Sequence, residues 1–192
     1  MERKKVYNGD FCDMKKVCVV TGGGSGIGFA AAKEAAKKGY YVMIVGRNEK
    51  KLAGAVEELR KDGCEAEAYS CDVSDREHCF ALARHAAECG AVKAVLHIAG
   101  MSPHMGDAEK IMQANALGTV NINDAFFEVI AEGGCVIDTS STSAYMAPSF
   151  IMPKRVYPLA CTDRKLFMDK MMKKVKMFPR KTREAVSYTH LR

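Results

Sequence analysis

Val17-Cys-Val-Val-Thr-Gly-Gly-Gly-Ser-Gly-Ile-Gly28 is the stretch of sequence that decides the fold. Its first five residues are apolar or β-branched and predict a buried strand. The glycines predict a tight turn, and residues with helical periodicity follow from Gly26 to about Lys38, where Gly39 is placed to end the helix. A glycine-rich turn between a strand and a helix brings backbone N–H groups close to a pyrophosphate. The stretch therefore predicts nucleotide binding, whereas an isolated motif without this context would indicate only a flexible loop.

The same alternation of strand and helix continues along the chain. The predicted strands are residues 17–21, 40–45, 65–70, 92–98 and 135–139, and the predicted helices are residues 26–38, 49–62, 75–89, 108–130 and 163–177. Connections between parallel strands of one sheet are right-handed. The sequence therefore predicts an α/β fold with a doubly wound parallel sheet of strand order 3-2-1-4-5 in three layers, followed by a C-terminal helical insert.

Length and composition suit one folded domain with an appended segment. The chain has 192 residues, of which 48% are hydrophobic and 27% charged, and this excludes a disordered protein. We expect a leader over residues 1–15, a nucleotide-binding domain over 16–141, and an extended loop and helix over 142–192. The N-terminus has no apolar segment behind its positive charges, and no apolar run approaches the ~20 residues that span a bilayer. We therefore expect a cytoplasmic protein without a membrane partner.

The net charge of +6 is concentrated near the C-terminus. Residues 152–183 contain eleven Lys or Arg and two Asp, which gives +9 and leaves −3 for the rest of the chain. We expect no nucleic-acid partner, because the basic character belongs to one segment. The alternative, an anionic surface bound through this segment, predicts salt-sensitive binding.

The eight cysteines are scattered without a C-x-x-C pair. Several fall in predicted strands or on helix faces, as Cys18 and Cys135 do, so we interpret them as small buried hydrophobic residues in a reducing compartment. We expect no metal and no disulfide, because no group of ligands has the spacing of a metal site.

The turn and several later motifs resemble the short-chain dehydrogenase/reductase family. Thr21 to Gly28 has the spacing T-G-x-x-x-G-I-G, and Asp72-Val73 resembles the acidic pair beside the adenine ring. Ala99-Gly100 resembles the end of the family's N-A-G, with isoleucine in the Asn place, and Asn115 resembles the Asn behind the active site. Ser140-Ser141 ends the fifth predicted strand, where the family keeps its catalytic serine. The resemblance covers residues 16–143 and extends more loosely to the C-terminus.

The long segment from Ser141 to Tyr188 is similar to that of the bacterial 3α-hydroxysteroid dehydrogenase/carbonyl reductase subgroup, as is Ile98-Ala-Gly-Met-Ser-Pro103. In the family, two further strands and a substrate-covering loop follow the catalytic helix. We therefore expect the chain to be C-terminally truncated.

The turn and the resemblance together define the candidate site. The candidate cofactor-binding residues are Thr21, Gly22, Gly24, Ser25, Gly26, Ile27, Gly28, Arg47, Asp72, Val73, Ala99 and Gly100, and the candidate catalytic residues are Asn115, Ser141, Tyr188 and Arg192.

NADP is the expected cofactor and NAD the less favoured one. An acidic residue at the end of the second strand would bind ribose hydroxyls and repel a 2′-phosphate, but this sequence has Gly46-Arg47 there. The Arg47 guanidinium suits a phosphate. The alternative is that Arg47 is only a solvated loop cation.

The catalytic acid is harder to assign. The family uses Y-x-x-x-K on a helix, because a nearby cation lowers the pKa of the tyrosine from its usual ~10. None of the seven tyrosines has a lysine four residues later. Tyr188, followed by Arg192, is the best candidate, and Tyr157 is poor because Pro158 follows it. The resemblance implies that Ser141 holds the substrate oxygen and that Asn115 supports a water or backbone relay, although Asn115 also suits a purely structural hydrogen bond.

Taken together, the sequence predicts an NADP-dependent oxidoreductase that interconverts an alcohol and a carbonyl on a small-molecule substrate, and the resemblance to the hydroxysteroid dehydrogenase subgroup implies a steroid-like one. The alternative is a catalytically inactive dinucleotide-binding fragment. Apolar residues of the last predicted helix share one face, namely Leu166, Phe167, Met168, Met171, Met172 and Val175. That face could cap an apolar substrate, pack on a second subunit of a homo-oligomer, or pack in the core.

Overall fold

The computed structural model describes residues 14–142, 154–179, 183 and 185–186. Its strands are β1 (Lys16–Thr21), β2 (Tyr41–Gly46), β3 (Ala66–Ser70), β4 (Ala91–His97) and β5 (Cys135–Asp138). Its helices are α1 (Gly26–Lys37), α2 (Glu49–Lys61), α3 (Arg76–Cys89), α4 (Ala108–Met112), η1 (Gln113–Leu117), α5 (Gly118–Phe127), α6 (Leu159–Thr162) and α7 (Arg164–Lys176). The strands form one parallel sheet of order β3-β2-β1-β4-β5, which confirms the predicted topology.

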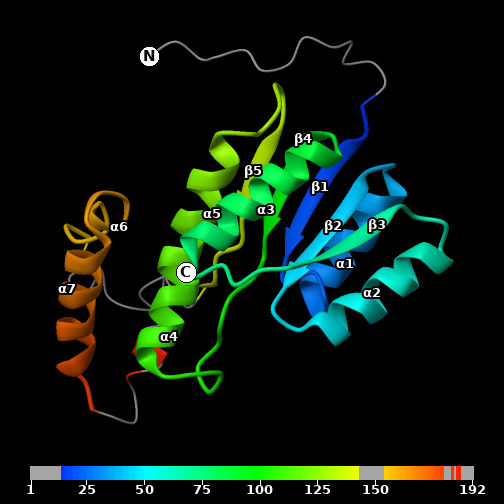
Figure 1. The fold of residues 1–192 in the computed structure, drawn as a ribbon. Helices are drawn as coiled ribbons and strands as arrows, with labels where there is room; N and C mark the ends of the chain where they lie inside the picture. The colour runs from blue at the N-terminus through cyan, green and yellow to red at the C-terminus, as the bar shows by residue number, and fades with distance from the viewer. Residues whose placement is uncertain (1–13, 143–153, 180–182, 184, 187–192) are drawn as a thin grey trace.

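Alternation along the central strands produces the three layers. Val17 and Val19 of β1 point to the face covered by α3 and α5, whereas Cys18 and Val20 point to the face covered by α1 and α2 (Figure 1). Successive side chains of a strand point to opposite faces, so a strand covered on both sides is a continuous apolar run. This is why β1 is recognisable in the sequence.

The edge strand β5 differs from the expectation of a buried strand. Cys135 is exposed, and Ile137 on the same face is 53% exposed. Their partners on β4 are Ala94 and Leu96, which pack with the α1–α2 layer, but that layer does not extend over β5 in the described residues. The interpretation of Cys135 as a buried hydrophobic residue is therefore wrong, and Cys161 is exposed as well.

The predicted helix over residues 108–130 is not continuous. It consists of α4, a five-residue π-helical segment η1 and α5, and it ends at Phe127. A π-helical turn inserts an extra residue into the helical ladder and is frequent at functional sites. Asn115 lies inside this segment.

Helix α7 packs beside α4 (Figure 1). Phe167, Met171 and Val175 are buried in a cluster with Ala108 and Met112 of α4, which favours the core-packing interpretation of the apolar face of α7. Leu166 was predicted on this face, but it is 38% exposed.

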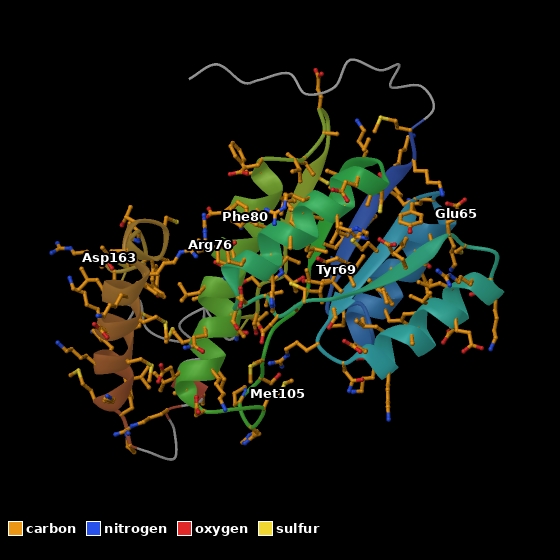
Figure 2. All side chains as sticks on the ribbon, in the orientation of Figure 1. Glu65, Tyr69, Arg76, Phe80, Met105 and Asp163 are labelled. Carbon is orange, nitrogen blue, oxygen red and sulfur yellow. The ribbon has the colours of Figure 1, made fainter. Side chains whose placement is uncertain are left out.

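Two arginines, one from α7 and one from α3, form ion pairs with one carboxylate of α5. Arg164 Nη2 of α7 lies 2.9 Å from Asp124 Oδ2 of α5, and Arg76 Nη1 of α3 lies 2.6 Å from the same oxygen. Arg76 also lies over the ring of Phe80, and Asp163 accepts a hydrogen bond from Leu166 N at the start of α7 (Figure 2). Of these contacts, the ion pair between Arg164 and Asp124 joins α7 to α5.

Among the described residues, no helix combines the length and apolar character that crossing a membrane requires.

Candidate nucleotide-binding site

The turn after β1 is fixed by the neighbouring strand. Gly22 N and Gly23 N both donate to Val45 O of β2, at 2.8 and 3.3 Å. Gly22 has φ +71°, a left-handed conformation that L side chains rarely adopt. At Gly28, a Cβ would lie 2.2 Å from Gly22 O, so no side chain fits there. The two glycines allow the start of α1 to lie directly against the turn.

No side chain at the N-terminus of α1 caps the first backbone N–H groups of the helix. Ser25 occupies the N-cap position in an extended conformation, and its side chain makes no capping hydrogen bond. The first turn of α1 contains no acidic residue. The first N–H groups of a helix lack partners within the helix and carry partial positive charge, so this end of α1 is suited to an anion.

A cleft of about 310 Å³ lies at the carboxyl ends of the strands, where open parallel sheets bind ligands. Nine of the predicted cofactor-binding residues line it: Gly22, Ser25, Ile27, Gly28, Arg47, Asp72, Val73, Ala99 and Gly100. Thr21 ends β1, Gly24 lies in the turn and Gly26 begins α1, and these three residues do not line the cleft. Cleft-lining residues that the sequence analysis missed are Val45, Gly46, Cys71, Ile98, Met101 and Ala114. All of them except Ala114 lie at the end of a strand or in the loop after it, which is the signal that could have found them.

Thr21 stabilises the loop that forms one wall of the cleft. Its hydroxyl is buried, and it accepts hydrogen bonds from Ile98 N and Ala99 N at 3.1 and 3.0 Å. Its Oγ1 also lies 2.8 Å from Nδ1 of His97. Because the two backbone groups already donate to this oxygen, the hydroxyl proton is directed to His97 Nδ1. Thr21 thus holds the loop after β4 beside the turn after β1.

His97 extends this network to the helix behind the cleft. Its Nε2 lies 3.2 Å from Thr119 Oγ1, and Thr119 Oγ1 donates to Asn115 O at 2.8 Å. With Nδ1 as acceptor, Nε2 carries the ring proton and donates to Thr119. The sequence analysis gave His97 no role, although a histidine inside the apolar run of β4 indicates a buried polar group that needs partners.

Asn115 is almost completely buried, and its side chain is engaged with one residue. Its Oδ1 accepts from Met101 N at 2.7 Å, and its Nδ2 donates to Met101 O at 2.9 Å. Met101 lines the cleft. The Asn115 side chain therefore positions the loop after β4. The backbone carbonyl oxygen of Asn115 accepts a hydrogen bond from the Thr119 hydroxyl.

Arg47 and Asp72 face each other at the edge of the cleft. Arg47 Nη1 lies 3.9 Å from Asp72 Oδ2, and the Arg47 side chain is 58% exposed. Burial raises the pKa of Asp72, but hydrogen bonds from Ser74 N and Ser74 Oγ, together with the Arg47 charge, outweigh it and hold the pKa below its usual value. The edge of the cleft therefore has an exposed cation beside a hydrogen-bonded carboxylate.

The predicted catalytic residues are placed only in part. Ser141 is half-buried and lies three residues beyond the end of β5, and it is not among the residues that line the cleft. Tyr188 and Arg192 lie outside the described residues. Burial raises the pKa of Tyr157, which is the wrong direction for a tyrosine that donates a proton near neutral pH.

Comparison with known proteins connects this geometry to a family. A family model described as short chain dehydrogenase matches residues 16–153. Sorbose reductase sou1 of Schizosaccharomyces pombe is 33% identical over 146 residues, which are 69% of this chain and 57% of that protein. A short chain dehydrogenase/reductase from Burkholderia phymatum in complex with NAD is 28% identical, with a TM-score of 0.65 over 70% of this chain and 52% of that chain.

A short chain dehydrogenase from Shigella flexneri 2a str. 301 complexed with NADP is 25% identical, with a TM-score of 0.63 over 69% of this chain and 62% of that chain. The chain spans about half the length of the curated relatives it matches. The matched region contains the whole sheet, the glycine turn and the cleft. The chain belongs to the short-chain dehydrogenase/reductase family.

Proposed function

We propose that this chain binds NADP and belongs to an oxidoreductase that interconverts an alcohol and a carbonyl. The bound nicotinamide would supply the hydride chemistry. The observation that carries the proposal is the cleft beside the first turn of α1, where Gly28, at which a Cβ would lie 2.2 Å from Gly22 O, lets the helix start directly against the turn. Backbone N–H groups without competing acidic side chains suit the linking phosphates of a dinucleotide.

The preference for NADP rests on the end of β2. Gly46 places no carboxylate there, and the Arg47 side chain is exposed and only 3.9 Å from Asp72. A dianionic 2′-phosphate would compete with Asp72 for the guanidinium, since charge-assisted hydrogen bonds to phosphate are strong. Thr21 and Asn115 do not contribute to this preference. They position the loop after β4, which forms the opposite wall of the cleft.

Binding of NADPH and NADH to the purified chain, measured by nucleotide fluorescence or calorimetry, tests the cofactor. Arg47→Ala is expected to weaken NADPH binding about 10–100-fold, as loss of a hydrogen bond to a charged group does, and to leave NADH nearly unchanged. Lys50→Ala, which removes an exposed cation three residues away, is the matched control. Equal losses for the two nucleotides would contradict the NADP assignment, and failure to bind either would contradict the proposal as a whole.

The substrate we propose is a small alcohol or ketone, and a steroid-like substrate is the narrower form of this proposal, supported by the resemblance of residues 98–103 to the hydroxysteroid dehydrogenase subgroup. Location in the cytoplasm and assembly into a homo-oligomer stay predictions. Size-exclusion chromatography at several concentrations tests the second.

A second candidate is a dinucleotide-binding chain without catalytic activity. It is favoured by one observation: none of the seven tyrosines is followed by lysine at the fourth position. Oxidation of NADPH in the presence of ketones, followed at the nicotinamide absorbance band, separates the two. Binding without turnover supports the inactive chain, and turnover contradicts it.

A further inference from the structure

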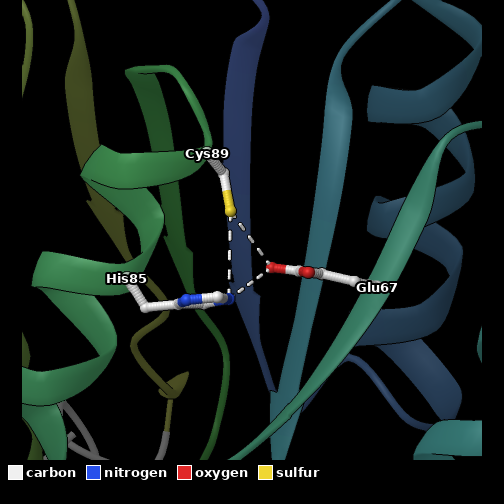
Figure 3. Close-up of side chains that lie close together, drawn as sticks. All are labelled: Glu67, His85 and Cys89. Carbon is white, nitrogen blue, oxygen red and sulfur yellow. Dashed lines mark hydrogen bonds and ion pairs between the residues drawn. The ribbon is translucent and has the colours of Figure 1, made fainter.

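We propose that Glu67, His85 and Cys89 form a binding site for a divalent cation of the zinc class. Glu67 comes from β3, and His85 and Cys89 come from successive turns of α3, so their side chains meet between strand and helix (Figure 3). Glu67 Oε1 lies 2.9 Å from His85 Nε2 and 3.5 Å from Cys89 Sγ. The third distance, from Cys89 Sγ to His85 Nε2, is 3.8 Å.

These three distances are close to those of a zinc coordination shell. Zinc binds sulfur, nitrogen and oxygen at about 2.0–2.3 Å, and tetrahedral angles then separate the ligand atoms by about 3.3–3.6 Å. The distance between Glu67 Oε1 and His85 Nε2 has to lengthen by a few tenths of an ångström, and the distance between Cys89 Sγ and His85 Nε2 has to shorten by a similar amount. Side-chain rotations achieve this without a change of backbone.

The surroundings of His85 resemble the outer shell of a metal site. A histidine that binds metal through one nitrogen usually donates the N–H of the other to a carboxylate, which fixes the ring. His85 Nδ1 lies 4.0 Å from Glu88 Oε2, which is beyond hydrogen-bond distance, and the Glu88 side chain is 78% exposed, so it has room to approach. The ring of Tyr69 packs on the His85 ring with centroids 5.2 Å apart. Nε2 is thereby presented to Glu67 and Cys89.

Charge and protonation also suit a dication. The Cys89 thiol donates to the Glu67 carboxylate, with 3.5 Å between sulfur and oxygen. A cation would displace that proton to solvent, and one thiolate and one carboxylate would then balance its charge. The other charged or titratable groups nearby are Lys15, Tyr41 and Glu88.

The site is separate from the nucleotide cleft. None of its three residues lines that cleft. The His85 and Glu67 side chains are 38% and 23% exposed, so a water molecule can reach the fourth position of a tetrahedral ion. The ion would link edge strand β3 to the end of α3. The spacing of potential ligands in the sequence predicts no metal. The three residues proposed here are not close together in sequence, because one comes from a strand and two come from a helix.

Titration of the chelator-treated chain with Co²⁺ and with Zn²⁺ tests the proposal. We expect one equivalent of Co²⁺ to produce a thiolate-to-cobalt charge-transfer band, and Zn²⁺ to abolish it. Zn²⁺ is also expected to raise the melting temperature, since a ligand that binds only the folded state stabilises it. Binding is expected to tighten from pH 6 to pH 8, because the bound form has lost the Cys89 proton.

Substitutions assign the ligands. Cys89→Ser is expected to abolish the charge-transfer band. Glu88→Gln is expected to weaken Co²⁺ binding about 10–100-fold, as loss of an outer-shell partner does. His85→Ala and Glu67→Gln remove ligands and are expected to weaken Co²⁺ binding by more than that. Cys64→Ser and His78→Ala are the matched controls, since Cys64 is also half-buried and His78 lies on the same helix.

Each variant is compared with itself with and without Zn²⁺, so that a loss of stability is not mistaken for a loss of ligand. If the wild-type chain shows no thiolate band, or if Zn²⁺ raises the melting temperature of Cys89→Ser as much as that of the wild type, the three residues form only a hydrogen-bonded group and the proposal is wrong.

Discussion

Thr21 Oγ1 lies 2.8 Å from His97 Nδ1, and the same oxygen accepts hydrogen bonds from the backbone of Ile98 and Ala99. One buried hydroxyl at the end of β1 thus serves three groups of β4 and its following loop. The threonine that begins the glycine turn therefore acts on the opposite wall of the cleft, which it holds in position without lining it.

Thr21→Val is expected to lower the free energy of unfolding by about 1–3 kcal/mol, because the substitution keeps the shape but leaves two buried N–H groups without their acceptor. Thr21→Ser keeps the hydroxyl and is expected to lose much less. Denaturant unfolding of both variants measures the difference. A loss in Thr21→Ser without a loss in Thr21→Val would show that the methyl group, and not the hydroxyl, matters at this position.

Asn115→Ala is expected to release the loop after β4, since both amide atoms of Asn115 bond to Met101. We expect a loss of about 1–3 kcal/mol for each buried group left unpaired, together with weaker NADPH binding. Gln113→Ala, a half-exposed position in the same π-helical segment, is the control. Hydrogen exchange at residues 99–101 measures the release, and unchanged exchange would contradict a positioning role for Asn115.

Gly28→Ala is expected to abolish nucleotide binding and to cost about 1–3 kcal/mol of stability, because its Cβ would lie 2.2 Å from Gly22 O. Gly54→Ala is the matched control: it lies inside α2, and a Cβ there meets nothing within 4 Å. An alanine in that helical position is expected to stabilise the protein by about 0.5–1 kcal/mol. Thermal unfolding and NADPH titration distinguish the two, and NADPH binding by Gly28→Ala at wild-type strength would refute the close contact.

Asp124→Ala is expected to loosen α7, since Arg164 of α7 and Arg76 of α3 share one oxygen of that carboxylate. The groups are partly exposed, so we expect a loss of about 1 kcal/mol, at the upper end for surface ion pairs. Asp169→Ala removes an exposed carboxylate of α7 itself and serves as the control. Faster hydrogen exchange over residues 164–176 in Asp124→Ala alone is the expected outcome, and equal rates would assign the docking of α7 to its apolar contacts.

The sequence by itself determined the sheet and the position of the nucleotide cleft. β1 and β2 are buried on both faces and are therefore continuous apolar runs, and the turn between β1 and α1 uses positive φ angles that favour glycine. Asn48 and Asp75 precede α2 and α3, and their side chains accept from Lys51 N and His78 N, so the starts of these helices also depend on local contacts.

Only the tertiary structure decided what depends on residues distant in sequence. Cys135 is exposed because the α1–α2 layer does not extend beyond β4 in the part of the chain that the structure describes, and the helix after β4 contains a π-helical segment from which Asn115 reaches back to Met101. His97 contacts Thr21 and Thr119, which lie 76 and 22 residues away in the sequence. Glu67 of a strand lies close to His85 and Cys89 of a helix. Periodicity reports which face of an element is apolar, but the partners of a polar side chain are fixed only when the elements pack.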